Sequence, residues 1–152
     1  MNSLSADRMI KATGSISALQ LGNDGTPIGV LDHARLGFTL NGQTYTIRRA
    51  GVFAPVYELL RDNVALVSAR QAPFVNRYTV TSAGRMWRLK AEEMLARRFG
   101  LFDGDARVGG ITPSSRFNYT RDISIDLPDE LPLEAQVFLM WLLLWNWGDT
   151  SS

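Results

Sequence analysis

Hydrophobic and polar residues alternate in short runs along most of the chain, and turn-forming residues separate these runs. The clearest case is Asn41-Gly42, which lies between an alternating run that ends at Leu40 and another that contains Tyr45 and Ile47. An Asn-Gly pair in this position is the strongest short-range signal for a β-hairpin, because both residues tolerate positive φ. The pattern recurs about twelve times, which predicts a mainly β protein built from short antiparallel strands as a barrel or a sandwich.

The candidate strands share either the alternating pattern or a short apolar run bounded by turn residues. They are residues 16–21, 28–31, 38–40, 45–47, 57–60, 64–67, 74–80, 86–89, 95–102, 108–111, 117–119 and 123–127. Residues 90–98 are also compatible with a helical turn, and both interpretations stay open. We expect a single domain over residues 1–152 with its core at about 14–148, and loose ends at 1–12 and 149–152.

Residues 133–147 are the most apolar part of the chain and read LEAQVFLMWLLLWNW. A surface helix has one apolar stripe, whereas this segment is apolar on every side, as in a protein core or a membrane. A membrane-spanning helix takes about 20 apolar residues, and the apolar run at 137–145 is shorter. We therefore predict a buried helix that follows Pro132 and stops at Gly148. A closed barrel covers such a helix on every side, and two facing sheets cover it less completely.

The net charge of +1 hides an uneven distribution of charged residues. Residues 35–121 carry thirteen arginines and one lysine against six acidic residues, whereas residues 122–152 carry six acidic residues and no basic one. A basic region of this kind can attract anions such as phosphate. Alternatively, these arginines are the solvated faces of strands, partly balanced by the acidic C-terminal segment.

No residue pattern in the chain indicates catalysis. There is no cysteine, and His33 is the only histidine, which excludes disulfides, thiolate sites and multi-histidine metal sites. Glu92-Glu93 would point to opposite faces of a strand. The sequence DGD at 103–105 and the glycine pair at 109–110 lack the residues that complete a calcium loop or a phosphate-binding loop. We expect a non-enzymatic protein with no cofactor, no metal and no nucleic-acid partner.

The order of these elements resembles the tubby C-terminal-like superfamily, especially its LURP-one-related and phospholipid scramblase branches. The resemblance rests on FGLFDG at 99–104 with VGGI at 108–111, on ISIDL at 123–127, and on LPLEAQVFLMWLLLWNW at 131–147. It implies roughly a dozen strands closed around a hydrophobic C-terminal helix, in a domain that binds anionic phospholipid headgroups or a membrane surface. The chain has no cysteine cluster for lipid attachment and no calcium loop, so the resemblance does not extend to scramblase activity.

In tubby proteins, basic residues on adjacent barrel strands hold a phosphoinositide. The nearest counterpart here is Arg88 with Lys90, because residues two apart share one face of a strand. Alternatively, both side chains simply face water opposite buried Trp87 and Leu89. Further basic candidates for the same site are Arg48, Arg49, Arg97 and Arg98.

The location and the partner follow from the same observations. Residues 1–10 contain no apolar run typical of a signal peptide, and the absence of cysteine suits a reducing compartment. We therefore expect a cytoplasmic protein that attaches peripherally to membranes. Three other functions stay open: a protein-interaction or scaffolding module without a lipid ligand, a hollow carrier of apolar ligands, and an enzyme whose site is assembled from loops.

Overall fold

The computed structural model describes residues 10–15, 18–23, 26–31, 36–73, 75, 77–92, 98–113 and 120–151. Within this part of the chain, twelve strands precede a C-terminal helix, so the predicted mainly β fold with a C-terminal helix is confirmed. The elements are β1 (Ile10–Ser15), β2 (Ala18–Asn23), β3 (Thr26–Leu31), β4 (Gly37–Leu40), β5 (Gln43–Ala50), β6 (Val56–Arg61), β7 (Val64–Gln71), β8 (Arg77–Ser82), β9 (Arg85–Ala91), β10 (Phe99–Asp103), β11 (Ala106–Pro113), β12 (Thr120–Asp126) and α2 (Leu133–Ser151).

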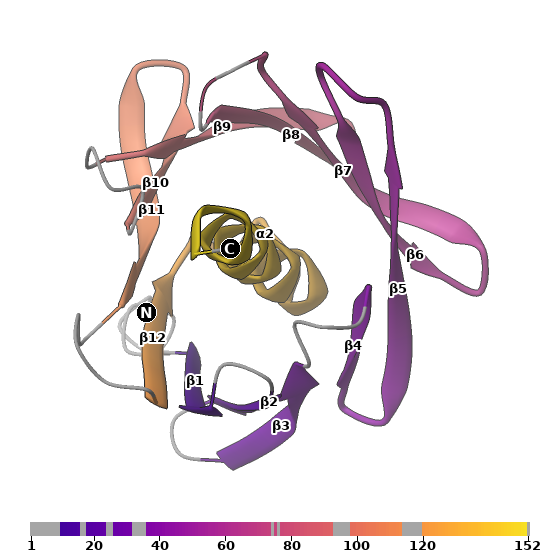
Figure 1. The fold of residues 1–152 in the computed structure, drawn as a ribbon, viewed down its shortest axis with the longest axis vertical. Coiled ribbons are helices and arrows are strands. Elements are labelled where there is room, and N and C mark those ends of the chain that lie inside the picture. Colours follow the sequence, from indigo (N-terminus) through magenta and orange to yellow (C-terminus); the bar gives the residue numbers. More distant parts are fainter. Residues whose placement is uncertain are drawn as a thin grey trace.

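The strands form one antiparallel sheet in which each strand pairs with the next one along the chain. β1 also pairs with β12, where Ile10 lies opposite Ile125, so the strand order returns to its start as a closed barrel. In Figure 1 the strands surround α2, which lies inside the ring. Because the strands alternate in direction, all connections fall at two ends of the molecule.

We name these two ends by what lies there. At the helix-start end, turns of two residues join β4 to β5, β6 to β7, β8 to β9 and β10 to β11, and the chain passes from β12 into α2. At the loop end, longer connections join β5 to β6 through residues 51–55 and β7 to β8 through residues 72–76.

The two-residue turns have the backbone conformation that the sequence predicts. Asn41 and Gly42 have φ values of 49° and 78°, as in a type I′ hairpin turn. Asp62 and Asn63, between β6 and β7, also have positive φ values of 53° and 66°. Such turns match the twist of the strands they join and therefore fix the pairing register of each hairpin.

The core consists of α2 and the inward-facing residues of the strands. Residues 137–144 of α2 are at most 1% exposed, which confirms that the apolar run is buried inside the protein as far as Leu144, and Trp145 is half-buried. The Trp141 ring packs edge-on against Tyr57, with centroids 6.0 Å apart, and stacks on Trp145 at 5.1 Å. Burial of each large apolar side chain contributes about 1.5–3 kcal/mol. The space that a hollow carrier needs is occupied by this helix.

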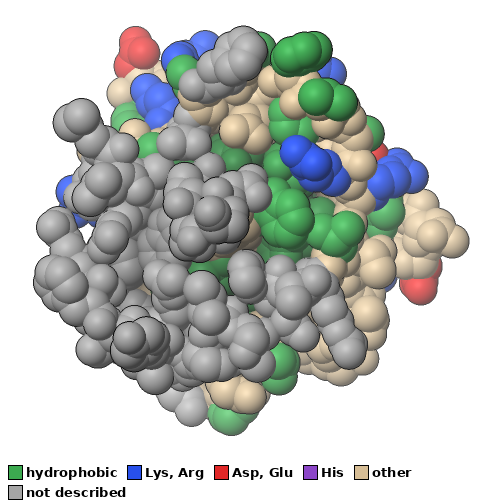
Figure 2. All heavy atoms as spheres, in the orientation of Figure 1, with side chains coloured by type: hydrophobic (Ala, Val, Ile, Leu, Met, Phe, Trp, Pro, Cys, Tyr) green, Lys and Arg blue, Asp and Glu red, His purple; other side chains and the backbone are tan. Residues whose placement is uncertain are grey.

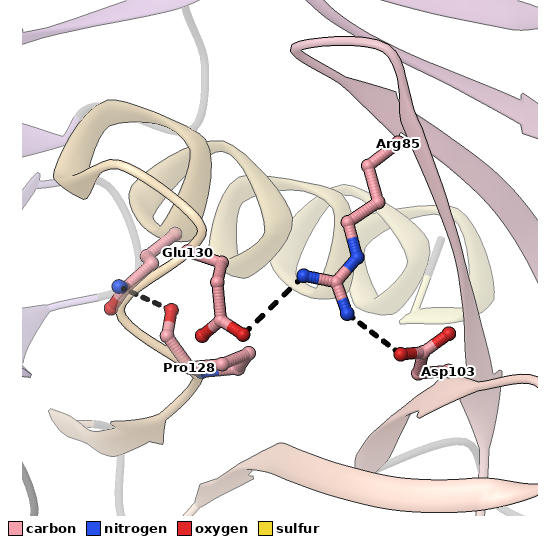
Figure 3. A network of polar contacts seen from close by, with 5 residues as sticks. Arg85, Asp103, Pro128 and Glu130 are labelled. Carbon is pink, nitrogen blue, oxygen red and sulfur yellow. Dashed lines mark hydrogen bonds and ion pairs between the residues drawn. The ribbon is translucent and has the colours of Figure 1, made fainter.

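An arginine links the barrel to the start of the helix. Arg85 of β9 donates from Nη2 to Asp103 Oδ2 at 2.7 Å and from Nη1 to Glu130 Oε2 at 3.3 Å (Figure 3). The hydrogen bond to Asp103 raises the pKa of Arg85, which keeps the guanidinium charged. The side chain of Gln136 donates to the backbone carbonyl of Pro128 at 3.4 Å. These contacts join β9, β10 and the first turn of α2 at the helix-start end.

Both ends of the chain differ from the prediction. β1 begins at Ile10, inside the expected loose end, and α2 continues through Gly148 to Ser151. The sequence of β1 has a weak apolar pattern, but β2 and β12 pair with it on both sides and satisfy its backbone groups. A glycine inside a helix costs only about 1 kcal/mol, so Gly148 need not end it.

Several expectations fall partly or wholly outside the described residues, among them the candidate strands that include residues 16–17, 74, 76 and 95–97. The candidate strand at 117–119 lies outside them. For residues 90–98, the sequence allowed either a strand or a helical turn. Residues 90 and 91 belong to β9, and residues 93–97 are not described.

Candidate functional site

Arg88 and Lys90 lie on the outer face of β9, as the alternating pattern predicts. Trp87 is 3% exposed and Leu89 is fully buried, so these two side chains face α2. Arg88 is exposed and Lys90 is half-buried on the opposite face. The ammonium group of Lys90 lies 4.3 Å from the ring centroid of Phe102, a cation–π contact that orients the lysine.

The pairing register brings two more arginines to the same outer face. Arg77 of β8 lies directly opposite Lys90. Arg70 of β7 lies opposite Thr79 of β8, and Thr79 lies opposite Arg88. Residues directly opposite have Cβ atoms about 4.5–5.5 Å apart, and diagonal neighbours about 7–8 Å, so Arg77 lies within about 8 Å of each of the other three residues. Arg70 lies two strands from Arg88 and Lys90, about 10 to 12 Å away. We call Arg70, Arg77, Arg88 and Lys90 the basic patch.

The basic patch has no acidic partner among the described residues. The ion pairs in this part of the chain involve Arg48, Arg85 and Arg107, and none involves Arg70, Arg77 or Arg88. Like charges placed directly opposite each other destabilise a β-sheet. Among the described residues, the patch is therefore a concentration of positive charge without a neutralising carboxylate.

Two carboxylates that border the patch in the described part of the chain are already paired with arginines outside it. On the β6 side, Glu58 Oε1 accepts hydrogen bonds from Arg48 Nη2 at 2.6 Å and Nε at 3.0 Å. Beyond the end of β9, Glu92 accepts from Arg107 Nε and Nη2, both at 2.8 Å. The hydrogen bonds from Arg107 lower the pKa of Glu92. These pairs border the basic patch and leave its charge intact.

The structure does not bring Arg48 and Arg49 into the basic patch. Both lie on β5, which is separated from β7 by β6. Arg48 is bound to Glu58, whereas Arg49 donates from Nε to the hydroxyl of buried Tyr57 at 3.2 Å. Adjacent residues of a strand point to opposite faces, so these two arginines do not act at one site.

The last two sequence candidates lie beyond the end of β9. Arg97 lies outside the described residues. Arg98 is exposed, immediately precedes β10, and accepts a backbone hydrogen bond from the Glu92 amide at 2.8 Å. Its positive charge also helps to lower the pKa of Glu92. The structure therefore places Arg98 near the paired border of the patch.

Sequence reasoning missed Arg70 and Arg77. Each alternates with buried neighbours on its own strand, since Ala69, Tyr78 and Val80 all face the core. That period of two predicts that both arginines face outward. It does not predict that they adjoin Arg88 and Lys90, because this depends on the register between three strands.

The described residues show neither a metal cluster nor a membrane span. Within the ranges that the structure covers, no three histidine or carboxylate side chains converge as a metal site. No helix in those ranges combines the length and the apolarity that a bilayer-spanning helix needs. Comparison of the chain with protein-family models, with curated proteins and with solved structures finds no match.

Proposed function

We propose that this protein is a non-enzymatic domain that binds anionic phospholipid headgroups at a membrane surface through the basic patch. The observation that carries this proposal is the grouping of Arg70, Arg77, Arg88 and Lys90 on one outer face with no ion-pair partner among the described residues. A bound phosphate would offset the repulsion between these cations. Arginine suits this role because its planar guanidinium forms bidentate hydrogen bonds with phosphate oxygens.

The sequence resemblance supports the same proposal. In tubby proteins, basic side chains from adjacent strands hold a phosphoinositide headgroup, and here basic side chains project from β7, β8 and β9. The closed barrel around α2 has the architecture that this resemblance implies. Membership of that superfamily is part of the proposal.

The number of cations sets the expected strength of binding. A basic residue near an anionic membrane surface contributes about 1 kcal/mol. Four such residues contribute about 4 kcal/mol, which corresponds to a dissociation constant of about 1 mM. Headgroup contacts by themselves therefore give weak, reversible and salt-sensitive attachment.

Vesicle co-sedimentation tests the proposal. The wild-type protein should bind vesicles of phosphatidylcholine mixed with phosphatidylserine, bind pure phosphatidylcholine far less, and dissociate as salt is added. The double substitution Arg88→Ala/Lys90→Ala removes two cations and should weaken binding about thirtyfold.

The matched control removes two cations from the helix-start end. Arg61 ends β6, and Arg85 begins β9. The double substitution Arg61→Ala/Arg85→Ala changes the net charge by the same amount and should leave vesicle binding near the wild-type level. Equal losses in both double variants would show attraction by net charge alone, and the absence of any wild-type binding would refute the proposal.

The alternative function is a protein-interaction or scaffolding module without a lipid ligand. Many such modules add a peptide strand to an exposed sheet edge. Every described strand of this barrel pairs on both sides, which leaves no free edge in the described sheet. A protein partner would have to contact a loop or the outer face, and such a protein would fail to bind vesicles in the experiment above.

A further inference from the structure

The connection between β5 and β6 exposes two neighbouring hydrophobic side chains. Val52 is 83% exposed and Phe53 is 73% exposed, more than any other large hydrophobic residue that the structure describes. Single exposed apolar residues are common on protein surfaces, but two at the tip of one loop make an apolar projection. We call Val52 and Phe53 the apolar tip.

The backbone of this loop is shaped so that its tip projects. Gly51 has a φ of 96°, a conformation that side chains other than glycine rarely adopt. Pro55, at the other side of the loop, is buried. Its carbonyl accepts a hydrogen bond from the backbone amide of Gln71 at 2.9 Å. The loop is thus anchored at its base while the apolar tip stays outside the core.

The same hydrogen bond holds the base of this loop beside the end of β7, which carries Arg70 of the basic patch. Gln71 follows Arg70 at the end of β7, and its side chain donates to the carbonyl of Val75 at 3.4 Å. Val75 belongs to the neighbouring connection and is also exposed. Arg77 begins β8 directly after this connection. The loop end therefore carries exposed apolar side chains next to cations of the patch.

The molecular surface at this end has the same combination. In Figure 1 the segment that joins β5 to β6 projects at the upper right. Figure 2, in the same orientation, shows hydrophobic side chains exposed at the upper right with Lys and Arg side chains close to them. Exposed Val64 and Met86 lie toward the helix-start end instead, where Arg85 is neutralised by Asp103 and Glu130.

We propose that Val52 and Phe53 insert into the interfacial region of an anionic bilayer while the basic patch contacts its headgroups, so that the barrel docks with its loop end toward the membrane. This inference rests on the proposed function and names the orientation and the apolar contact that accompany it. Stable membrane attachment generally takes two signals, and an apolar anchor together with a basic patch is one such combination. The described residues place both signals at one end of the molecule.

Site-specific fluorescence tests the insertion directly. The chain contains no cysteine, so one introduced cysteine carries a single label. An environment-sensitive nitrobenzoxadiazole label at Val52→Cys should shift to shorter wavelength when vesicles containing phosphatidylserine are added, and lipids brominated on the acyl chain should quench it. The matched control is Val64→Cys, which is 59% exposed at the helix-start end and should show neither change.

A pair of charge substitutions measures how much the apolar tip contributes to binding. Val52→Asp should weaken vesicle binding by at least tenfold, because it removes the apolar side chain that would enter the bilayer and adds a negative charge near an anionic surface. Val64→Asp makes the same chemical change at the helix-start end and should bind like the wild type. Circular dichroism spectra of both variants should match the wild-type spectrum.

The possible outcomes separate this inference from the function on which it rests. If the wild type binds vesicles but the label at position 52 stays in water and Val52→Asp binds normally, insertion is wrong and headgroup binding stands. If the wild type binds no vesicles, both proposals fail. If the label at position 52 shifts without vesicles as protein concentration rises, the apolar tip contacts a second copy of the chain, and insertion is again wrong.

Discussion

The two faces of the β7–β9 wall have opposite chemistry, although the same strands form both. The inner face presents side chains that are at most 3% exposed, namely Ala69, Tyr78, Val80, Trp87 and Leu89. The outer face presents Arg70, Arg77, Thr79, Arg88 and Lys90. Because successive residues of a strand point to opposite faces, one period-2 pattern encodes both surfaces. From this comparison we expect the inward-facing residues of β7–β9 to determine stability and the outward-facing residues to determine binding.

The outer face is not arranged for stability. Arg77 and Lys90 lie directly opposite each other, and Thr79 lies between Arg70 and Arg88 where a carboxylate would pair with either. Natural proteins retain such unfavourable arrangements where function requires them. The inner face has aromatic contacts instead, such as Tyr78 with Phe99 at 6.1 Å between ring centroids. Substitutions on the two faces should therefore have separable effects.

The largest change in stability is expected for a substitution in the core, which the inner face of these strands borders. Trp141 is fully buried, and its ring contacts Tyr57 and Trp145. Trp141→Ala removes this side chain and leaves a cavity between α2 and the wall, so it should lower the free energy of unfolding by about 3–5 kcal/mol. Urea denaturation followed by circular dichroism measures the change.

The matched control for Trp141→Ala is a hydrophobic residue on the outer face. Met86 is 64% exposed, so Met86→Ala should change the free energy of unfolding by no more than about 0.5 kcal/mol. A loss of stability below about 1 kcal/mol for Trp141→Ala would mean that α2 does not pack inside the barrel as the structure shows.

Much of the fold is predictable from local sequence. The Asn41-Gly42 turn follows from residues that tolerate positive φ, and the burial of 137–144 follows from a run with no polar side. β1 is less predictable, because its strand conformation comes from pairing with β2 and β12 rather than from its own pattern. The helix end was misplaced because glycine is a frequent but not an obligatory stop.

The candidate site is only half predictable. Alternation places Arg88 and Lys90 on one face without any knowledge of the neighbouring strands. Arg70 and Arg77 required the register between β7, β8 and β9, which long-range pairing determines. Arg48 and Arg49 were both named as candidates for one site, yet adjacent residues of a strand point to opposite faces. The rule that separated Glu92 from Glu93 applied equally to this pair of arginines.

A smaller effect is expected when a carboxylate is placed inside the basic patch. Thr79 lies opposite both Arg70 and Arg88, so Thr79→Glu would give the patch the acidic partner that it lacks. Cross-strand ion pairs contribute about 0.2–1 kcal/mol, so the free energy of unfolding should rise by that amount. Binding to vesicles containing phosphatidylserine should weaken about fivefold, since the patch loses one unit of positive charge.

Thr79→Gln is the control for this substitution, because it has nearly the same size and shape without the charge. Its stability and its vesicle binding should both stay close to the wild-type values. If Thr79→Glu and Thr79→Gln weaken vesicle binding equally, the loss of binding comes from the shape of the side chain rather than from its charge. Destabilisation by Glu would show that the outer face already satisfies its arginines, contrary to the comparison of the two faces.

The smallest effect is expected at the border of the patch, where Glu92 binds Arg107. Hydrogen bonds from Arg107 hold the pKa of Glu92 below its ordinary value of 4.5, so this pair stabilises the fold above that pH and ceases to do so as pH falls through the lowered pKa. Glu92→Gln should therefore lower the free energy of unfolding by less than about 1 kcal/mol at neutral pH and have no effect in strong acid. The same substitution removes a negative charge beside Lys90, so vesicle binding should strengthen by up to about fivefold. Urea denaturation across pH and co-sedimentation at neutral pH measure the two changes, and effects of the same sign would contradict the separation of stability from binding.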